Sequence, residues 1–197
     1  MKYLLKKLLR LLFGNYSIYR IYTSSPATSS PPYSSKTVPF TVGQVGKSDL
    51  TQSTDTLIRE QTGYLGEDSF AFACFDGERV VGVCVYWFGA RYRTRNFWPL
   101  AEHQAKLVQI ITLPEMRGRN VASTLIARST SAMHEKGFEL NFARIWHSNT
   151  PSLRAFTRAG WSCIATVVEI NPLRLRRPLR IRLNRSADGP AKPCKPA

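Results

Sequence analysis

Apolar residues recur along the chain in two rhythms, and their alternation predicts a domain built from strands and helices. Short runs rich in β-branched and aromatic residues predict seven strands, at 39–45, 70–75, 79–88, 106–113, 140–146, 161–170 and 179–183. Helical spacing predicts helices after Ser48, over 121–136 and over 152–159. This order predicts an α/β fold with a mixed, mostly antiparallel sheet of six to seven strands flanked by helices.

The first residues follow a different pattern. Lys6, Lys7 and Arg10 fall within a sector about 100° wide on a helical wheel, and leucines with Phe13 fill the rest. We therefore expect a basic amphipathic helix over 1–22, too short in its apolar run to span a bilayer. It suits the interface of an anionic membrane, or it packs its leucine face on the domain or a second subunit. Four residues further on suit a headgroup region: Tyr16, Tyr19, Arg20 and Tyr22.

Positive charge is concentrated at the two ends of the chain. Residues 1–36 hold six basic residues and no acidic one, and residues 171–197 hold eight basic residues beside Asp188, so the ends carry 13 of the 15 net charges. We expect the anionic partner to meet the ends and not the nearly neutral domain. The chain divides into a helix (1–22), a Ser/Thr/Pro-rich linker (23–37), a folded domain (38–185) and a disordered basic tail (186–197).

The four cysteines are scattered and have no metal-binding spacing. Three of them lie in strand-like runs, where a free thiol packs as a small apolar group: Cys74, Cys84 and Cys163. We expect no metal site, and a reducing cytoplasm is the simplest setting.

The segment that carries most chemistry begins where the strand over 106–113 ends. Pro114 closes that strand, and a turn containing Arg117, Gly118 and Asn120 opens the next helix. Such a turn directs several backbone N–H groups at one spot beside a helix N-terminus, which is a site for a phosphate or pyrophosphate. Strand–turn–helix units with glycine are common, so the turn alone fits plain structure equally well.

A second element, over 147–161, changes the interpretation. Taken alone it is an ordinary capped helix. Together the two elements resemble the signatures of the GNAT superfamily of N-acetyltransferases, densely over 105–161. The first signature appears as Thr112-Leu113-Pro114 with Arg117-Gly118-Arg119-Asn120-Val121-Ala122, and the second as Asn149, Ser152, Phe156, Gly160 and Trp161.

The resemblance implies acetyl-CoA as the cofactor. In the family the pantetheine arm lies along the strand end, the amides of the turn hold the pyrophosphate, and Arg117 and Arg119 would add charge. Asn149 would contact the arm and Phe156 would line the thioester end. The implied cofactor-binding residues are Ile110, Ile111, Thr112, Arg117, Gly118, Arg119, Asn120, Val121, Ala122, Asn149, Ser152 and Phe156.

Two positions depart from the family pattern. The family usually has glycine at position 120, and it often has at position 156 a tyrosine that protonates the leaving thiolate. Phe156 has no proton to donate. Cofactor binding survives both changes, whereas catalytic efficiency is less secure.

The implied reaction is attack of a primary amine on a thioester, and a general base then removes a proton. Candidate bases are Glu102, His103 and His147, each of which also fits a solvent-exposed position. The acceptor is unidentified. An envelope amino sugar or a lipid-linked precursor, acetylated by a cytoplasmic enzyme at the inner face of the membrane, would account for the basic ends. Arginines and aromatics between the third and fourth strands fit either acceptor recognition or an exposed loop: Arg91, Arg93, Arg95, Phe97 and Trp98.

Two other function classes compete with this interpretation. A nucleic-acid-binding protein would use the arginine-rich run over 173–185, but no aromatic stacking platform is interleaved with it. A non-catalytic acyl-CoA-binding module would agree with Asn120 and Phe156. Turnover of acetyl-CoA separates that module from the enzyme.

Overall fold

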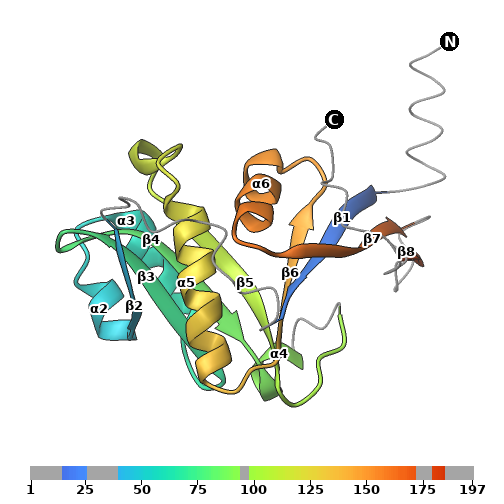
Figure 1. The fold of residues 1–197 in the computed structure, drawn as a ribbon, viewed down its shortest axis with the longest axis horizontal. Coiled ribbons are helices and arrows are strands. Elements are labelled where there is room, and N and C mark those ends of the chain that lie inside the picture. Colours follow the sequence, from blue (N-terminus) through green and yellow to red (C-terminus); the bar gives the residue numbers. More distant parts are fainter. Residues whose placement is uncertain (1–14, 26–39, 94–97, 172–178, 185–197) are drawn as a thin grey trace, which may run out of the picture.

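The structure, a computed structural model, describes residues 15–25, 40–93, 98–171 and 179–184, and its centre is a mixed eight-stranded sheet (Figure 1). The strand order is β2-β3-β4-β5-β6-β1-β7-β8, and every neighbouring pair is antiparallel except β5–β6. The strands are β1 (Asn15–Ser24), β2 (Thr41–Val45), β3 (Ser69–Asp76), β4 (Arg79–Trp87), β5 (Gln104–Thr112), β6 (Leu140–Trp146), β7 (Ser162–Asn171) and β8 (Leu179–Asn184). The predicted mixed, mostly antiparallel architecture is confirmed, with one strand more than expected.

Helices flank this sheet, and three of the places where they lie were predicted: after Ser48, over 121–136 and over 152–159. They are α2 (Lys47–Thr51), α3 (Thr56–Arg59), the 3₁₀ turn η2 (Glu60–Tyr64), α4 (Gly89–Arg93), the 3₁₀ turn η3 (Pro114–Met116), α5 (Val121–Glu135) and α6 (Thr150–Arg158). The longest, α5, packs across β2 to β5 because Leu125, Ile126 and Met133 form one fully buried stripe. Short α4 was not predicted. No helix among the described ranges is long and apolar enough to cross a bilayer.

The strand β1 corrects the N-terminal prediction. Residues 15–22 were expected to continue a helix, but they pair antiparallel with β6 on one side and β7 on the other. Tyr19, Ile21 and Tyr22 are at most 1% exposed, so two of the three tyrosines expected at lipid headgroups are core residues, whereas Tyr16 is exposed. Aromatic and β-branched side chains fit the second half of this central strand, where Tyr19 and Ile21 are buried on one face and Tyr22 on the other.

Two domain boundaries change accordingly. Thr23 and Ser24 belong to β1 and not to the linker, and the folded unit includes a strand that lies before residue 38. The predicted helix before residue 15, most of the predicted linker, and the predicted tail over 186–197 lie outside the described residues.

The alternation of β1 divides the apolar core into two clusters. Tyr22 belongs to the main core, which α5 and α6 cover. Tyr19 and Ile21 face the other side, in a smaller cluster with Trp98, Phe142, Ala165 and Val167. The guanidinium of Arg182 lies 3.8 Å from the centre of the Trp98 ring.

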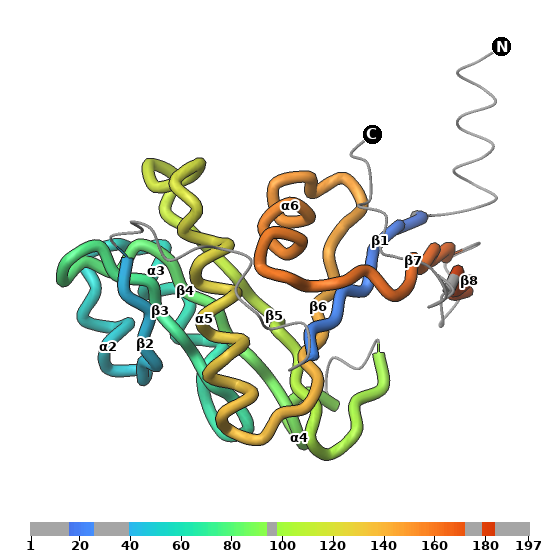
Figure 2. Tube along the Cα trace, viewed as in Figure 1, coloured from blue at the N-terminus to red at the C-terminus, as the bar shows by residue number. Residues whose placement is uncertain are grey.

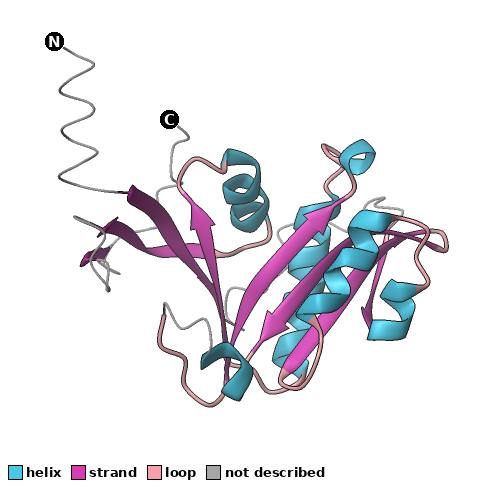
Figure 3. Cartoon of the chain, turned by 180° about the vertical axis from the view of Figure 1, so that it is seen from behind, coloured by secondary structure: helices cyan, strands magenta, loops and turns pink. Residues whose placement is uncertain are grey.

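The two parallel strands in the middle of the sheet separate partway along their length. β5 and β6 pair only from Gln104↔Leu140 to Leu107↔Ala143. On the other edge of β5, the register shift against β4 leaves Val108 as the extra residue of a β-bulge. A bulge bends the strand that carries it, so β5 turns away from β6 directly after their last pair. The strands therefore run apart towards the turn that precedes α5 (Figures 1 and 3).

Candidate active site

A cavity of about 690 Å³ lies where β5 and β6 have separated, between the N-terminal end of α5 and the helix α6. It is lined by the end of β5, by the turn and first residues of α5, and by one side of α6. Eleven of the twelve residues proposed for the cofactor line it: Ile110, Ile111, Thr112, Arg117, Gly118, Asn120, Val121, Ala122, Asn149, Ser152 and Phe156. Arg119 is the exception, and its guanidinium lies 3.6 Å from Met116 Sδ.

The turn between β5 and α5 lies at the N-terminal end of α5 (Figures 1 and 2) and has the backbone geometry of an anion site. Gly118 and Asn120 both have positive φ, at 81° and 65°. Asn120 caps α5, and its carbonyl accepts the N–H of Thr124. The N–H groups of Val121, Ala122 and Ser123 precede that first helical bond, so they remain available at the positive end of the helix dipole. Although Asn120 stands where the family usually has glycine, this turn therefore has the free N–H groups and the helix dipole that a pyrophosphate site needs.

A glycine in the sheet brings this turn close to the strands. A Cβ atom on Gly82 of β4 would lie 3.1 Å from both the Ile111 carbonyl oxygen and Val121 Cγ1. A side chain there would require Ile111 or Val121 to shift by a few tenths of an ångström, because these contacts are tighter than ordinary packing.

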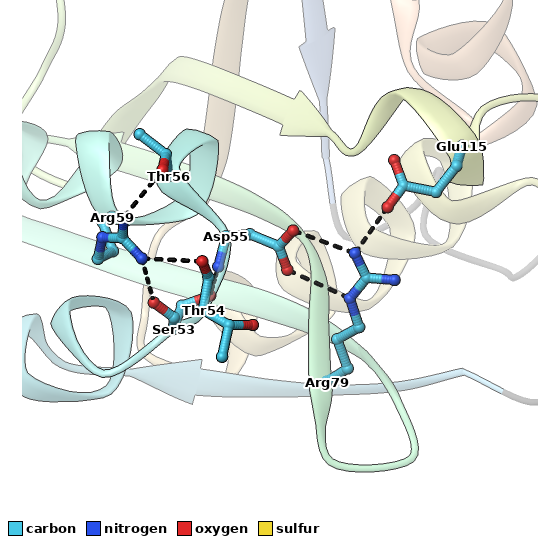
Figure 4. A network of polar contacts seen from close by, with 7 residues as sticks. All are labelled: Ser53, Thr54, Asp55, Thr56, Arg59, Arg79 and Glu115. Atoms are coloured by element: carbon cyan, nitrogen blue, oxygen red, sulfur yellow. Dashed lines mark hydrogen bonds and ion pairs between the residues drawn. The ribbon is translucent and has the colours of Figure 1, made fainter.

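A polar network on the surface holds the other side of the turn (Figure 4). Arg79 at the start of β4 forms ion pairs with Asp55 at 3.0 Å and with Glu115 of η3 at 2.6 Å. Hydrogen bonding to Arg79 lowers the pKa of Asp55, whereas a backbone hydrogen bond and then Arg79 lower the pKa of Glu115. The pairs are exposed and add little stability, but they connect α3, β4 and η3, and are lost as pH falls through the lowered carboxyl pKa values.

The cavity has a cationic rim. Arg117 comes from the turn, and Arg154 and Arg158 come from successive turns of α6, so their side chains leave the same side of that helix. No acidic residue is among the lining residues. Arg158 Nη1 also donates to Asn120 Oδ1 at 3.3 Å, which links α6 to the turn. This charge suits a ligand that carries several phosphates.

The start of α6 is ordered by its own cap. Asn149 Oδ1 accepts the backbone N–H of Ser152 at 3.2 Å, so the amide NH₂ group is the part of this side chain that can serve a ligand carbonyl. Phe156 is 2% exposed and packs edge-on against Trp161, with ring centres 5.0 Å apart. Behind it lies Tyr22 of β1, 6.2 Å away between ring centres. The inserted strand therefore supports the wall of the cavity.

The candidate bases fall into two groups. Glu102 and His103 come just before β5, whereas the cavity begins at Ile110, roughly 20 Å further along an extended strand. They do not line the cavity, because β5 separates from β6 towards its C-terminal end, whereas these two residues precede its N-terminal end.

His147 directly follows β6, two residues before Asn149. Its backbone N–H donates to the Ile18 carbonyl at 3.0 Å, and its Nδ1 lies 3.1 Å from the same oxygen. A carbonyl only accepts, so Nδ1 carries the proton in the neutral ring and Nε2 keeps its lone pair. The side chain does not line the cavity, and its Nε2 is not engaged by Ile18.

Two of the five arginines and aromatics between β4 and β5 have structural contacts. Arg91 lies over the Trp87 ring at 4.7 Å and donates to the Leu65 carbonyl. Trp98 is 8% exposed, and its backbone N–H and C=O both bond Tyr92 Oη. These side chains hold α4 and its loop. Arg93 is exposed, and Arg95 and Phe97 lie outside the described residues.

The buried thiols take no part in the cavity. Burial raises the pKa of both Cys74 and Cys84 to about 12, so each stays a protonated thiol at neutral pH. Cys84 Sγ donates to Ser129 Oγ at 3.4 Å, and Tyr86 Oη lies 3.0 Å from the same hydroxyl. Within the described ranges, no cluster of His, Cys, Asp and Glu could hold a metal ion.

The sequence matches the family model described as "Acetyltransferase (GNAT) family" over residues 37–161, more than half of the chain. The chain belongs to the GNAT acetyltransferase family. Members of this family transfer acyl groups, so the cavity is the place to look for acyl transfer. No curated protein matches the chain.

Solved structures agree with the family at the level of the fold. A GNAT-family acetyltransferase from Colwellia psychrerythraea is 12% identical with a TM-score of 0.57, covering 84% of this chain and 60% of its own. A GCN5-related N-acetyltransferase from Sphaerobacter thermophilus is 13% identical with a TM-score of 0.56, covering 95% and 58%. This GNAT chain therefore spans about 60% of the length of these two relatives.

We expect Asn120→Ala to lower the free energy of unfolding of this GNAT protein by about 1 kcal/mol, because alanine pays a steric cost at positive φ. Asn120→Gly restores the usual family residue, and its free energy of unfolding should be no more than a few tenths of a kcal/mol below that of the wild type. Urea denaturation of the three proteins measures the difference. Equal stability of the alanine and glycine variants would show that the turn is not left-handed at this residue.

Proposed function

We propose that this protein is an N-acetyltransferase that moves an acetyl group from acetyl-CoA to a primary amine. The observation that carries the proposal is the cavity itself, which gathers eleven of the twelve residues named for the cofactor from three separate elements. Its cationic rim and its turn with available N–H groups suit the phosphates of acetyl-CoA. Its apolar strand end suits the pantetheine arm.

Acetyl-CoA supplies the activated acetyl group as a thioester, and the residues of the chain bind and orient it. The turn from Arg117 to Ala122 holds phosphate through backbone N–H groups, and Arg154 and Arg158 add charge at the rim. The end of β5 no longer pairs with β6, so it offers backbone groups to the amide-containing arm. Phe156 closes the inner wall and excludes water without donating a proton.

We assign the candidate general base to His147, which follows β6 two residues before the lining residue Asn149 and would act through water because it does not line the cavity. Its Nδ1–H bond to Ile18 leaves Nε2 as the acceptor for a proton. Replacing His147 with glutamine should lower kcat by about 100-fold and leave acetyl-CoA affinity within about twofold. Steady-state kinetics with a calorimetric titration measure the two values. An unchanged kcat would remove His147 from the mechanism.

The acceptor and the location form the finer part of the proposal. We infer an acceptor amine on an envelope amino sugar or a lipid-linked precursor, met in a reducing cytoplasm at the inner face of the membrane. Two observations support this: Cys74 and Cys84 are buried free thiols, and the basic charge lies at the ends of the chain. A homodimer formed through the leucine-rich N-terminal segment is the competing use of that segment.

Release of free CoA thiol from acetyl-CoA, followed with a thiol-reactive dye over a panel of amines, tests the enzyme proposal. Stimulation by amino sugars over the background hydrolysis is the expected result. Tight acetyl-CoA binding without turnover on any amine would instead support the non-catalytic binding module. A nucleic-acid-binding role is disfavoured because Arg180 pairs with Glu169 and Arg182 stacks on Trp98.

A further inference from the structure

The strands β1, β7 and β8 carry an apolar face that nothing in the described part of the chain covers. Tyr16 is 69% exposed, and Leu179, Ile181 and Leu183 of β8 are 57%, 45% and 56% exposed. The register places these side chains on one side, because Tyr16 pairs with Ile170, Ile170 with Leu179, and Val168 with Ile181. We call this surface the apolar face: Tyr16, Val168, Ile170, Leu179, Ile181 and Leu183.

The alternation of β8 is the reverse of what an edge strand facing water needs. Its arginines are exposed too, but they lie on the side of Trp98, where Arg180 Nε donates to Glu169 at 2.7 Å and the Arg182 guanidinium lies over the Trp98 ring. Its leucines and isoleucine point outward. Exposed edge strands usually present charge to solvent to prevent association, so this inverted strand marks a contact surface.

The sequence segments that adjoin one end of this face are basic. Asn15 pairs with Asn171, and Leu179 pairs with the neighbouring Ile170, so β1 begins where β7 ends and β8 begins. The segments that join here, 1–14 and 172–178, contain no acidic residue. Their seven basic residues are Lys2, Lys6, Lys7, Arg10, Arg174, Arg176 and Arg177.

Apolar surface beside unbalanced positive charge is the combination that an anionic bilayer recognises. The apolar side chains enter the boundary between headgroups and acyl chains, and each nearby cation adds attraction to the surface. A second copy of the chain fits less well, because a face-to-face dimer would collect twice the basic charge with no acidic residue of these segments to balance it.

We propose that the apolar face is the docking surface of this protein for an anionic lipid bilayer. The inference builds on the membrane location proposed above but does not require acetyl transfer. Lipid contact would then involve the strands β1, β7 and β8, leaving the cavity between α5 and α6 for the cofactor.

Co-sedimentation with vesicles tests the proposal on the full chain. Wild-type protein should bind vesicles of phosphatidylcholine with phosphatidylglycerol, and bind poorly to phosphatidylcholine alone. The variant Leu179→Ser/Ile181→Ser/Leu183→Ser should lose at least about tenfold in partitioning, because three apolar side chains no longer enter the bilayer. Leu57→Ser, at a leucine of α3 that is 38% exposed, is the matched control and should bind like the wild type.

Three results would overturn the proposal. The first is failure of the wild type to bind anionic vesicles. The second is binding of the triple variant equal to that of the wild type, which would assign binding to the basic segments alone. The third is a wild-type dimer in sedimentation analysis that the triple variant converts to monomer, which would make the face a subunit interface. Thermal unfolding and acetyl-CoA titration of the same samples check the fold and keep this test separate from that of the enzyme.

Discussion

Replacing Tyr22 with alanine is expected to lower the free energy of unfolding by about 3–5 kcal/mol, the usual cost of removing a large aromatic side chain from a core. Tyr22 is 1% exposed, packs against Phe156, and lies on a strand held between β6 and β7. The variant should also weaken cofactor binding, because the ring stands behind the wall of the cavity. Urea denaturation measures the stability and calorimetry the affinity.

Tyr16→Ala is the matched control for this prediction. Tyr16 lies on the same strand, but it is 69% exposed, so its replacement should change stability by no more than about 0.5 kcal/mol. Equal stability of the two variants would mean that β1 does not insert into the sheet, and the account of both core clusters would be wrong.

The double variant Arg154→Ala/Arg158→Ala should lower acetyl-CoA affinity by about 100-fold. Each arginine lies at the cavity rim on the same side of α6, and a hydrogen bond to a charged group contributes roughly 1.5–3 kcal/mol. The wild-type affinity should fall as salt is raised, and the affinity of the double variant should fall less. Fluorescence or calorimetric titration at two salt concentrations measures both effects.

Arg128→Ala provides the control for charge alone. Arg128 is exposed on α5 and is not among the residues that line the cavity, so its loss removes one positive charge without removing a contact. A similar loss of affinity in this variant would show that the rim arginines act only through net charge.

Local patterns in the sequence predicted most of the fold. The seven strands from β2 to β8 and the helices α5 and α6 follow from periodicity and from glycine and proline at their ends. The strand β1 was missed because the leucine-rich segment before it was extended through Tyr22. Its Tyr and Ile residues were the available signal, but burial on both faces removes the simple alternation that marks a half-exposed strand. Its place between β6 and β7 depends on contacts more than 100 residues away in the chain, which no local pattern encodes.

The residues proposed for the cofactor were easier to place together from sequence than the candidate bases. The turn and the start of α6 are continuous stretches with strong local requirements, so naming them from sequence also placed them at the cavity. Sequence did not reveal Arg154 and Arg158, although their spacing of four residues on a predicted helix was a usable signal. Glu102 and His103 were chosen because they immediately precede β5, but the cavity lies at the other end of β5, where it no longer pairs with β6.

Calorimetric titration of the wild type with acetyl-CoA, beside Arg117→Ala/Asn149→Ala, tests the central claim most directly. The account predicts binding on the order of micromolar that the double variant loses, because one residue comes from the turn and the other from the cap of α6. Equal binding by both proteins, or no binding by the wild type, would contradict the assignment of this cavity to acetyl-CoA.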